Sequence, residues 1–323
     1  AAGRGCPAAR GRSPEEGSPL TKRPILIDGG FDQSAAALLL ALQCPSLALT
    51  GVTTSTGCET AAYAAQQLSR LLADMGVHAP VAAGAAQPLM RPLPGDAELR
   101  QPCAPKKGEP ATGQTALDLQ VQILSESKTP VTLLVTGPLT GVALLLLARP
   151  DCKEKIDHIT ITGGALRGGD CTPVAEHNFF LDPEAADIVL KSGVPAVVLG
   201  LDVTRSAALT QEELAALRAL PSAAAQRTAA LLECAASGAV SQGELPLRGM
   251  CAVLWEMAPA LFETTPSHLE VETASEFCDG ALISDLRGLS GLPRAHRVAV
   301  GVDRARAAAL VLNSFAAGEG SGQ

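Results

Sequence analysis

The segment Arg23–Ser34, RPILIDGGFDQS, constrains the fold more than any other part of the chain. Its apolar run Pro24–Ile27 predicts a short buried strand, and Ala35–Gln43 predicts a helix just after a glycine-rich turn. A strand, a tight turn and a helix commonly open an α/β domain, in which ligands bind outside the carboxyl ends of the strands. Asp28 and Asp32 lie in the turn. Either both carboxylates point into one crevice, or Asp32 only caps the helix.

Strand and helix patterns alternate along the rest of the chain. Further strands are expected at Leu47–Thr54, Val81–Gly84, Val131–Val135, His158–Thr162, Ala196–Leu201 and Arg297–Val302. Helices are expected at Glu59–Met75, Thr115–Ser125, Gly141–Ala148, Glu184–Ser192, Ala207–Ser237, around Cys251–Met257 and from Arg304 to Phe315. This alternation predicts an α/β fold with an open, mainly parallel sheet flanked by helices. Near the C-terminal end, Leu269–Thr273 and Ala281–Asp285 predict a small antiparallel hairpin.

The domain organisation follows from composition. Residues 1–22 are rich in Gly, Pro, Arg and Ser without apolar periodicity, which predicts a disordered tail. Residues 23–323 are expected to form one domain. Within it, Gln87–Gly113 is rich in proline and glycine and predicts a long loop, of the kind that forms functional lids or stays disordered.

The net charge indicates which kinds of partner the protein does not bind, and the cysteines indicate its cellular compartment. The net charge is −8, with 25 Lys+Arg against 33 Asp+Glu, which argues against nucleic acid or an anionic membrane as the main partner. No apolar run approaches the roughly 20 residues that cross a bilayer. The nine cysteines contain no CxxC pair, and several lie in apolar contexts. They predict reduced, buried thiols in a cytoplasmic protein.

Four stretches together resemble a known family. They are ILIDGGFDQSAA at Ile25–Ala36, LVTGPLTGVALLL at Leu134–Leu146, ITGGALRGGDCTPVAEHNFFLDPEAA at Ile161–Ala186 and ELPLRGMCAV at Glu244–Val253. In this order they resemble the inosine–uridine-preferring nucleoside hydrolases, and the resemblance runs from about Arg23 to Phe315.

The resemblance implies hydrolysis of the N-glycosidic bond of purine or pyrimidine ribonucleosides. In that family a calcium ion binds a water and the ribose 2′- and 3′-hydroxyls, and an aspartate deprotonates the water. Calcium takes six to eight oxygen ligands and activates bound water, so the chemistry is physically reasonable. The implied partner is a nucleoside or another ribose-containing small molecule. Family members are commonly dimers or tetramers, so a homo-oligomer is also implied. The sequence does not give the base preference.

The catalytic and metal positions carry over one at a time. Asp32 falls on the family's general base. Asp28 matches a conserved aspartate of the metal site, Gln33 stands where a second aspartate ligand is usual, and Thr136 matches a threonine whose main-chain carbonyl binds the ion.

The residues at the family's ribose-binding positions match the family pattern less well. Glu176 and Asn178 match residues that hold the sugar hydroxyls, and Asp170 stands where the family usually has Asn. Cys58 stands at another usual Asn. The alternatives are that Glu176 only satisfies buried backbone groups and that Cys58 is an inert buried thiol.

The metal cage is degraded at several positions. Leu26 and Gln33 replace aspartates, and Arg248–Gly249 replaces a His–Asp pair. Fewer negative ligands weaken a calcium site, which is therefore expected to be weak or vestigial. On this mapping, changing Gln33 and Gly249 to Asp should raise metal affinity. An alternative for Arg248 is that it replaces the metal and anchors a sugar hydroxyl or a phosphate.

Two functions remain open at this point. One is a nucleoside hydrolase whose activity is impaired by the substituted calcium ligands. The other is a catalytically inactive homologue that binds a nucleoside-like ligand or a protein partner.

Overall fold

The computed structural model describes residues 22–93, 113–237 and 245–317. The expectation for residues 1–22 lies outside this part of the chain except at Lys22, and so does residue range 94–112 of the expected long loop.

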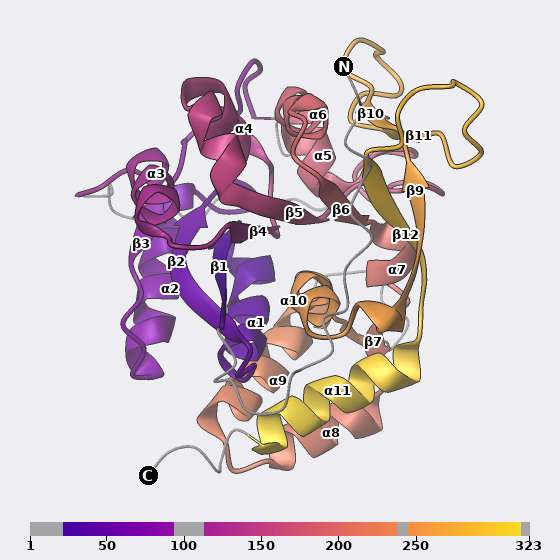
Figure 1. Cartoon of the computed structure of the whole chain (residues 1–323). Coiled ribbons are helices and arrows are strands. Elements are labelled where there is room, and N and C mark those ends of the chain that lie inside the picture. Colours follow the sequence, from indigo (N-terminus) through magenta and orange to yellow (C-terminus); the bar gives the residue numbers. More distant parts are fainter. Residues whose placement is uncertain (1–21, 94–112, 238–244, 318–323) are drawn as a thin grey trace.

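One eight-stranded sheet forms the centre of the molecule (Figure 1). Its order is β3 (Val81–Ala83), β2 (Leu47–Thr54), β1 (Arg23–Asp28), β4 (Val131–Val135), β5 (Ile156–Thr162), β6 (Ala196–Leu199), β12 (His296–Val302) and β9 (Phe262–Ser267). Neighbouring strands are parallel except β9, which runs antiparallel to β12. The prediction of a mainly parallel sheet is confirmed. Strand β9 was not predicted, since its sequence FETTPS is largely polar and contains a proline.

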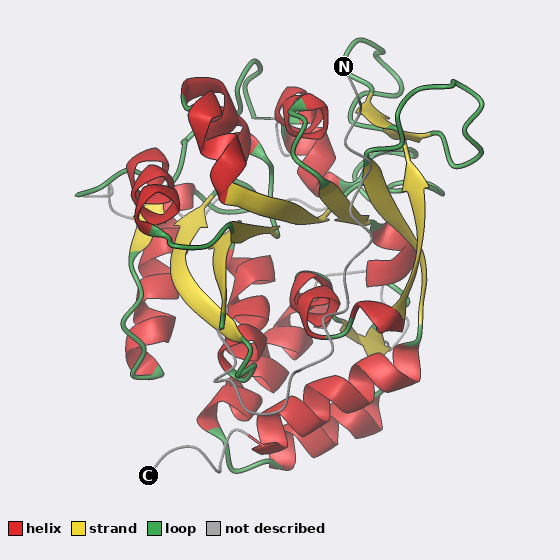
Figure 2. Ribbon diagram, viewed as in Figure 1, coloured by secondary structure: helices red, strands yellow, loops and turns green. Residues whose placement is uncertain are grey.

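Helices cover both faces of the sheet (Figure 2). One face carries α1 (Phe31–Leu42), α2 (Ala61–Asp74), α7 (Leu201–Thr204), α8 (Gln211–Ala219), α9 (Ala223–Ser237), α10 (Met250–Met257) and α11 (Arg304–Ala317). The other carries α3 (Ala116–Glu126), α4 (Thr140–Ala148), α5 (His177–Leu181) and α6 (Pro183–Lys191). Strand β1 belongs to both cores, because Ile25 and Ile27 pack on the first face and Leu26 on the second. Burial on both faces explains the continuous apolar run in the sequence.

The expected single helix Ala207–Ser237 is wrong. Ala208–Leu209 forms β7, which pairs with β8 (Leu245–Pro246), and two helices follow. Thr210 starts α8 with a capping box. Leu220 ends it with extended backbone, as expected for a residue before a proline.

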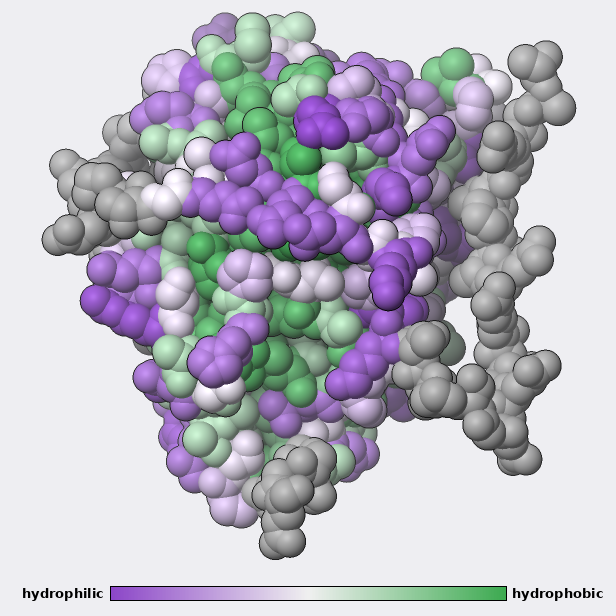
Figure 3. Space-filling view, turned by 60° about the vertical axis from the view of Figure 1, so that its left-hand side comes forward, coloured by the Kyte–Doolittle hydropathy of each residue, from purple (hydrophilic) through white to green (hydrophobic). Residues whose placement is uncertain are grey.

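The small antiparallel hairpin near the C-terminal end is confirmed. It pairs β10 (Leu269–Val271) with β11 (Leu282–Ser284). Two short 3₁₀ helices, Pro150–Lys155 and Pro259–Leu261, complete the described elements. In the described part of the chain, no helix has both the length and the apolar character needed to cross a membrane. Figure 3 shows hydrophobic and hydrophilic strips mixed on the face that carries the β3 side of the sheet.

A buried charge network fixes the amino ends of the strands. Glu256 of α10 is buried and accepts hydrogen bonds from Arg23 at 2.8 Å and from His158 at 2.9 Å. Burial alone would lower the pKa of His158, but hydrogen bonds to Asp157 and Glu256 outweigh it and raise that pKa to about 9. The network ties α10 to the amino ends of β1 and β5, opposite the glycine-rich turn.

This network predicts a pH-dependent stability. The pKa of His158 is higher in the folded chain, so its contribution is fully present below pH 6.5 and is lost as the pH rises through about 9. Between pH 6.5 and 9.5, the free energy of unfolding of the wild type should fall by roughly 2–4 kcal/mol more than that of His158→Gln. Urea denaturation at several pH values measures this difference. The exposed His78→Gln is the control, and a similar pH profile in His158→Gln and the wild type would contradict the network.

Candidate functional site

The glycine-rich turn lies where the strand order reverses. From β1 the chain proceeds outward to β2 and β3, then returns to place β4 on the other side of β1. The loops after β1 and β4 approach closely here, since a Cβ added to Gly137 would lie 2.8 Å from the Cα of Gly29. A Cβ on Gly29 would lie 2.4 Å from Thr136 Oγ1. Ligands of open α/β sheets bind in the crevice at such a reversal.

Asp28 ends β1 and is fully buried. Thr53 Oγ1 donates a 2.5 Å hydrogen bond to Asp28 Oδ2, and Gln120 Nε2 approaches the same oxygen at 3.4 Å. Burial raises the pKa of Asp28 to about 6, and the bond from Thr53 only partly opposes the shift. Oδ1 has no hydrogen-bond partner within the described residues. Asp28 therefore lies in an enclosed, weakly polar environment.

Thr136 is tied to the same turn. Its N–H donates to the carbonyl oxygen of Asp28 at 2.7 Å, and its Oγ1 shares a 2.7 Å hydrogen bond with Ser34 Oγ. The side chain is buried, so these contacts hold the loop after β4 against the start of α1. The position predicted for a main-chain metal ligand thus lies directly beside Asp28.

Asp32 lies in the first turn of α1 and is exposed. The N-cap of this helix is Gly30, so the alternative in which Asp32 serves as the cap is wrong. Glu59 Oε1 accepts the N–H of Phe31 at 2.5 Å. Asp32 Oδ1 accepts the N–H of Gln33 at 2.8 Å, and Oδ2 makes no hydrogen bond to a described residue. Asp28 and Asp32 thus lie in different environments, one enclosed and one open to solvent.

Glu59 was missed by the sequence analysis. Gly30 has no side chain that could accept a hydrogen bond at the start of α1. The Glu59 carboxylate accepts the N–H of Phe31 instead, from a position 28 residues further along the chain. The sequence shows an acidic residue next to Cys58 in a short loop. Nothing in this loop indicates that the acidic side chain contacts α1.

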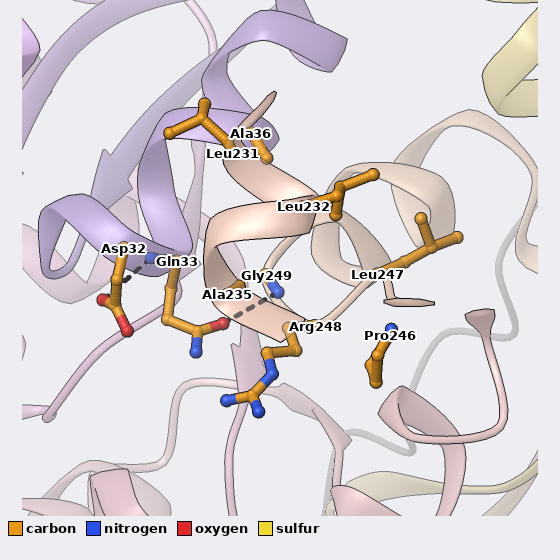
Figure 4. Close-up of a pocket in the computed structure, with 10 residues that line it drawn as sticks. All are labelled: Asp32, Gln33, Ala36, Leu231, Leu232, Ala235, Pro246, Leu247, Arg248 and Gly249. Atoms are coloured by element: carbon orange, nitrogen blue, oxygen red, sulfur yellow. Dashed lines mark hydrogen bonds between the residues drawn. The ribbon is translucent and has the colours of Figure 1, made fainter. Parts of the chain in front are cut away.

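A hollow opens beside Asp32 (Figure 4). Its lining comes from α1, the end of α9 and the segment that leads into α10: Asp32, Gln33, Ala36, Leu231, Leu232, Ala235, Pro246, Leu247, Arg248 and Gly249. Gln33 Oε1 accepts the N–H of Gly249 at 3.2 Å, which joins the two sides of the hollow. The fold therefore brings together four positions that the resemblance assigned to one site, namely 32, 33, 248 and 249.

Glu176 and Asn178 satisfy buried backbone groups. Glu176 Oε2 accepts the N–H groups of Gly164 at 3.0 Å, Asn178 at 2.9 Å and Phe179 at 3.3 Å, and so caps α5. Asn178 Nδ2 donates to the carbonyl oxygen of Thr162 at 2.9 Å. Burial, then the negative charge of Asp170, raise the pKa of Glu176. Glu176 Oε1 makes no hydrogen bond to a described residue, so one carboxyl oxygen stays available to a ligand.

Asp170 and Cys58 converge on His177. Asp170 Oδ1 accepts the N–H of His177 at 2.9 Å, and Cys58 Sγ lies 3.6 Å from His177 Nε2. Cys58 is disulfide-bonded, so the prediction of a reduced, inert thiol is wrong at this position. The disulfide removes the S–H, so Cys58 cannot donate a hydrogen bond to a sugar. Cys44, Cys152 and Cys251 are buried free thiols, as predicted.

The donor set does not fit a calcium cage. Asp28 is the one carboxylate of the three predicted metal positions, and Gln33 Oε1 already accepts from Gly249. A Cβ at Gly249 would lie 2.4 Å from the carbonyl oxygen of Gln33, so the backbone leaves no room for an aspartate there. Within the described ranges, no three or more His, Cys, Asp or Glu side chains gather where they could hold a metal. Calcium requires more charged oxygen ligands than this.

Comparison with known proteins decides the family. A sequence model of the inosine-uridine preferring nucleoside hydrolases matches residues 25–309. This chain belongs to that family. The pyrimidine-specific ribonucleoside hydrolase RihA of Shewanella oneidensis is 38% identical over 310 residues, which cover 91% of this chain and 96% of that protein.

Solved nucleoside hydrolases share the fold. The plant nucleoside hydrolase PpNRh1 superposes with a TM-score of 0.80 at 25% identity, covering 91% of this chain and 99% of that one. A purine-preferring ribonucleoside hydrolase from Gardnerella vaginalis superposes with a TM-score of 0.79 at 25% identity, covering 92% and 99%. The α/β prediction and the family resemblance are both confirmed.

The contact at Gly249 predicts that side chains are not tolerated there. Gly249→Ala should lower the free energy of unfolding by about 1–3 kcal/mol, because its Cβ would press on the carbonyl oxygen of Gln33. Urea denaturation measures the loss, with Gly57→Ala as the control, since its Cβ would meet only ordinary contacts at 3.8 Å. The expectation that Gly249→Asp raises metal affinity is revised accordingly. A variant that combines Gln33→Asp and Gly249→Asp, stays as stable as the wild type and binds calcium would show that the backbone adapts.

The capping contacts of Glu176 predict a second effect on stability. Glu176→Ala should lower the free energy of unfolding by about 1–3 kcal/mol, because three N–H groups lose their acceptor. Glu176→Gln keeps an acceptor oxygen and should lose less than about 1 kcal/mol. Denaturation of both variants, with exposed Glu212→Ala as the control, tests this. Equal losses for the two Glu176 variants would show that capping is not the contribution of this side chain.

Proposed function

We propose that this chain binds pyrimidine ribonucleosides and hydrolyses their N-glycosidic bond slowly, with Asp32 as the general base. Asp32 Oδ2 accepts a proton from water, and the water oxygen forms a bond to the anomeric carbon as the C1′–N bond breaks. The nucleobase leaves with the electron pair of that bond and takes a proton from solvent. Positive charge develops on the ribose in such a reaction, and nearby carboxylates stabilise it. The observation that carries the proposal is the exposed Asp32 carboxylate, with one oxygen held by Gln33 and the other open, at the rim of the hollow.

Ribose binding is assigned to groups around this carboxylate. Glu176 Oε1 is available, and Asp170 and Asn178 lie on the same turn and helix. Electrostatic interactions connect His177 with Asp32 and Asp170, which supports their proximity. Cys58 contributes packing rather than a hydrogen bond, because its sulfur is in a disulfide.

The low rate follows from the donor set. The described residues lack the carboxylates that would hold a calcium ion. Asp32 therefore activates the water without a calcium ion bound by these residues. The same observation favours a second candidate, a catalytically silent homologue that retains only ligand binding. The preference for a pyrimidine rests on the RihA relatives, which are named pyrimidine-specific and are more similar than the purine-preferring structure.

Substitution of Asp32 tests the assignment of the base. Asp32→Asn should lower the turnover of uridine by about 10²- to 10⁴-fold, the usual contribution of a general base. Calorimetric binding of uridine should change little, because an amide still offers an oxygen beside the ribose. Release of uracil, followed by chromatography, measures turnover. Asp74→Asn, on the exposed end of α2, is the control.

Three outcomes separate the candidates. Turnover that falls in Asp32→Asn with retained uridine binding supports the proposal. Binding without turnover in the wild type selects the silent homologue. Turnover that rises strongly with micromolar calcium would show that the donor set holds the ion despite its substitutions.

A further inference from the structure

Arg248 has a backbone conformation that ordinary side chains avoid. Its φ of 38° is the one positive value outside glycine among the residues that the structure describes. Such a conformation costs of the order of 1–3 kcal/mol and persists where the surroundings enforce it. Here Leu247 N–H donates to Ala207 at 2.7 Å, Gly249 N–H donates to Gln33, and Cys251 N–H donates to Arg248 at 2.9 Å.

The charge of Arg248 has no structural explanation. Its guanidinium makes no hydrogen bond or ion pair to any described residue. It also precedes α10, and a cation at a helix N-terminus is unfavourable because the helix dipole is positive there. The backbone conformation and the local electrostatics both disfavour an arginine here, and no contact with a described residue offsets them, which points to a ligand contact.

The guanidinium lies among groups of the candidate site. Arg248, Asp32 and Gln33 extend toward the same side of the hollow (Figure 4). Gln33 uses Oε1 to bind Gly249, so its Nε2 is a donor for a ligand. Burial chiefly lowers the pKa of His177, with Asp32 and Asp170 acting against the shift and Arg248 adding to it, so each of these three charges lies near His177.

We propose that Arg248, together with Gln33 Nε2, binds the two vicinal hydroxyls of the ribose and thereby takes the place of a metal ion. A guanidinium presents donors in a planar fork that suits two adjacent oxygens. The Asp32 carboxylate can accept a hydrogen bond from one of the same hydroxyls. A neutral diol fits this site better than a phosphate, because the Asp32 carboxylate lines the same hollow as Arg248.

This inference rests on the proposed function and specifies how the ribose is recognised. It predicts metal-independent binding and a preference for ribose over 2′-deoxyribose. With EDTA present, wild-type protein should bind uridine about tenfold or more tighter than 2′-deoxyuridine, because the second hydroxyl pairs with a charged donor. Arg248→Ala should lose most of this ratio, because it weakens the binding of uridine more than that of 2′-deoxyuridine, which has only one of the two hydroxyls.

Calorimetry with uridine and 2′-deoxyuridine, both in EDTA, tests the assignment. Arg248→Asn is the fold-preserving variant, because asparagine tolerates positive φ, and Arg248→Lys keeps the charge without the fork. Arg70→Ala, on the exposed face of α2, is the matched control and should retain the wild-type ratio. Melting temperatures of all variants check the fold.

The outcomes distinguish this inference from the proposed function. A ratio that collapses in Arg248→Asn and stays intact in Arg70→Ala supports the assignment. A wild-type ratio in Arg248→Asn, with uridine still bound and hydrolysed, overturns this inference alone. No binding of uridine by the wild type overturns both.

Discussion

The close approach of the loops after β1 and β4 is the constraint on which the site depends. Gly29 and Gly137 meet backbone to backbone, which lets the Thr136 N–H reach the carbonyl oxygen of Asp28. The Asp28 side chain is buried beside this contact, and Gly30, which follows in the same turn, is the N-cap of α1. The side chains of Asp32 and Gln33 then project from the first turn of this helix in fixed directions. A larger residue at either glycine would separate the two loops.

Much of the fold is predictable because its signals are local. The run VTLLV in β4 is buried at every position, and the alternation of Ile25, Leu26 and Ile27 between two cores appears as an uninterrupted apolar strand. Strand β9 and the break after Leu220 were not predicted. Strand β9 is largely polar and forms through its pairing with β12. The break after Leu220 depends on one proline in an alanine-rich stretch.

The site is predictable in position but not in its bonding. Residues 32, 33 and 248–249 line one hollow, and a hydrogen bond from the Gly249 N–H to Gln33 Oε1 joins two of them. Glu59 and the disulfide of Cys58 involve partners that no local pattern indicates. The capping bonds of Glu176 to Asn178 and Phe179 are local, but its bond to the N–H of Gly164, twelve residues away, appears only when the chain is folded.

The two edges of the central sheet have a consequence for self-association. Edge strand β3 has three residues, and edge strand β9 contains Pro266, which has no N–H to donate. Short edges and prolines discourage the addition of a further strand. Copies of this chain are thus protected from joining sheet to sheet. Assembly through the central sheet is therefore disfavoured, which leaves the hydrogen-bonded centre of each molecule independent of its neighbours.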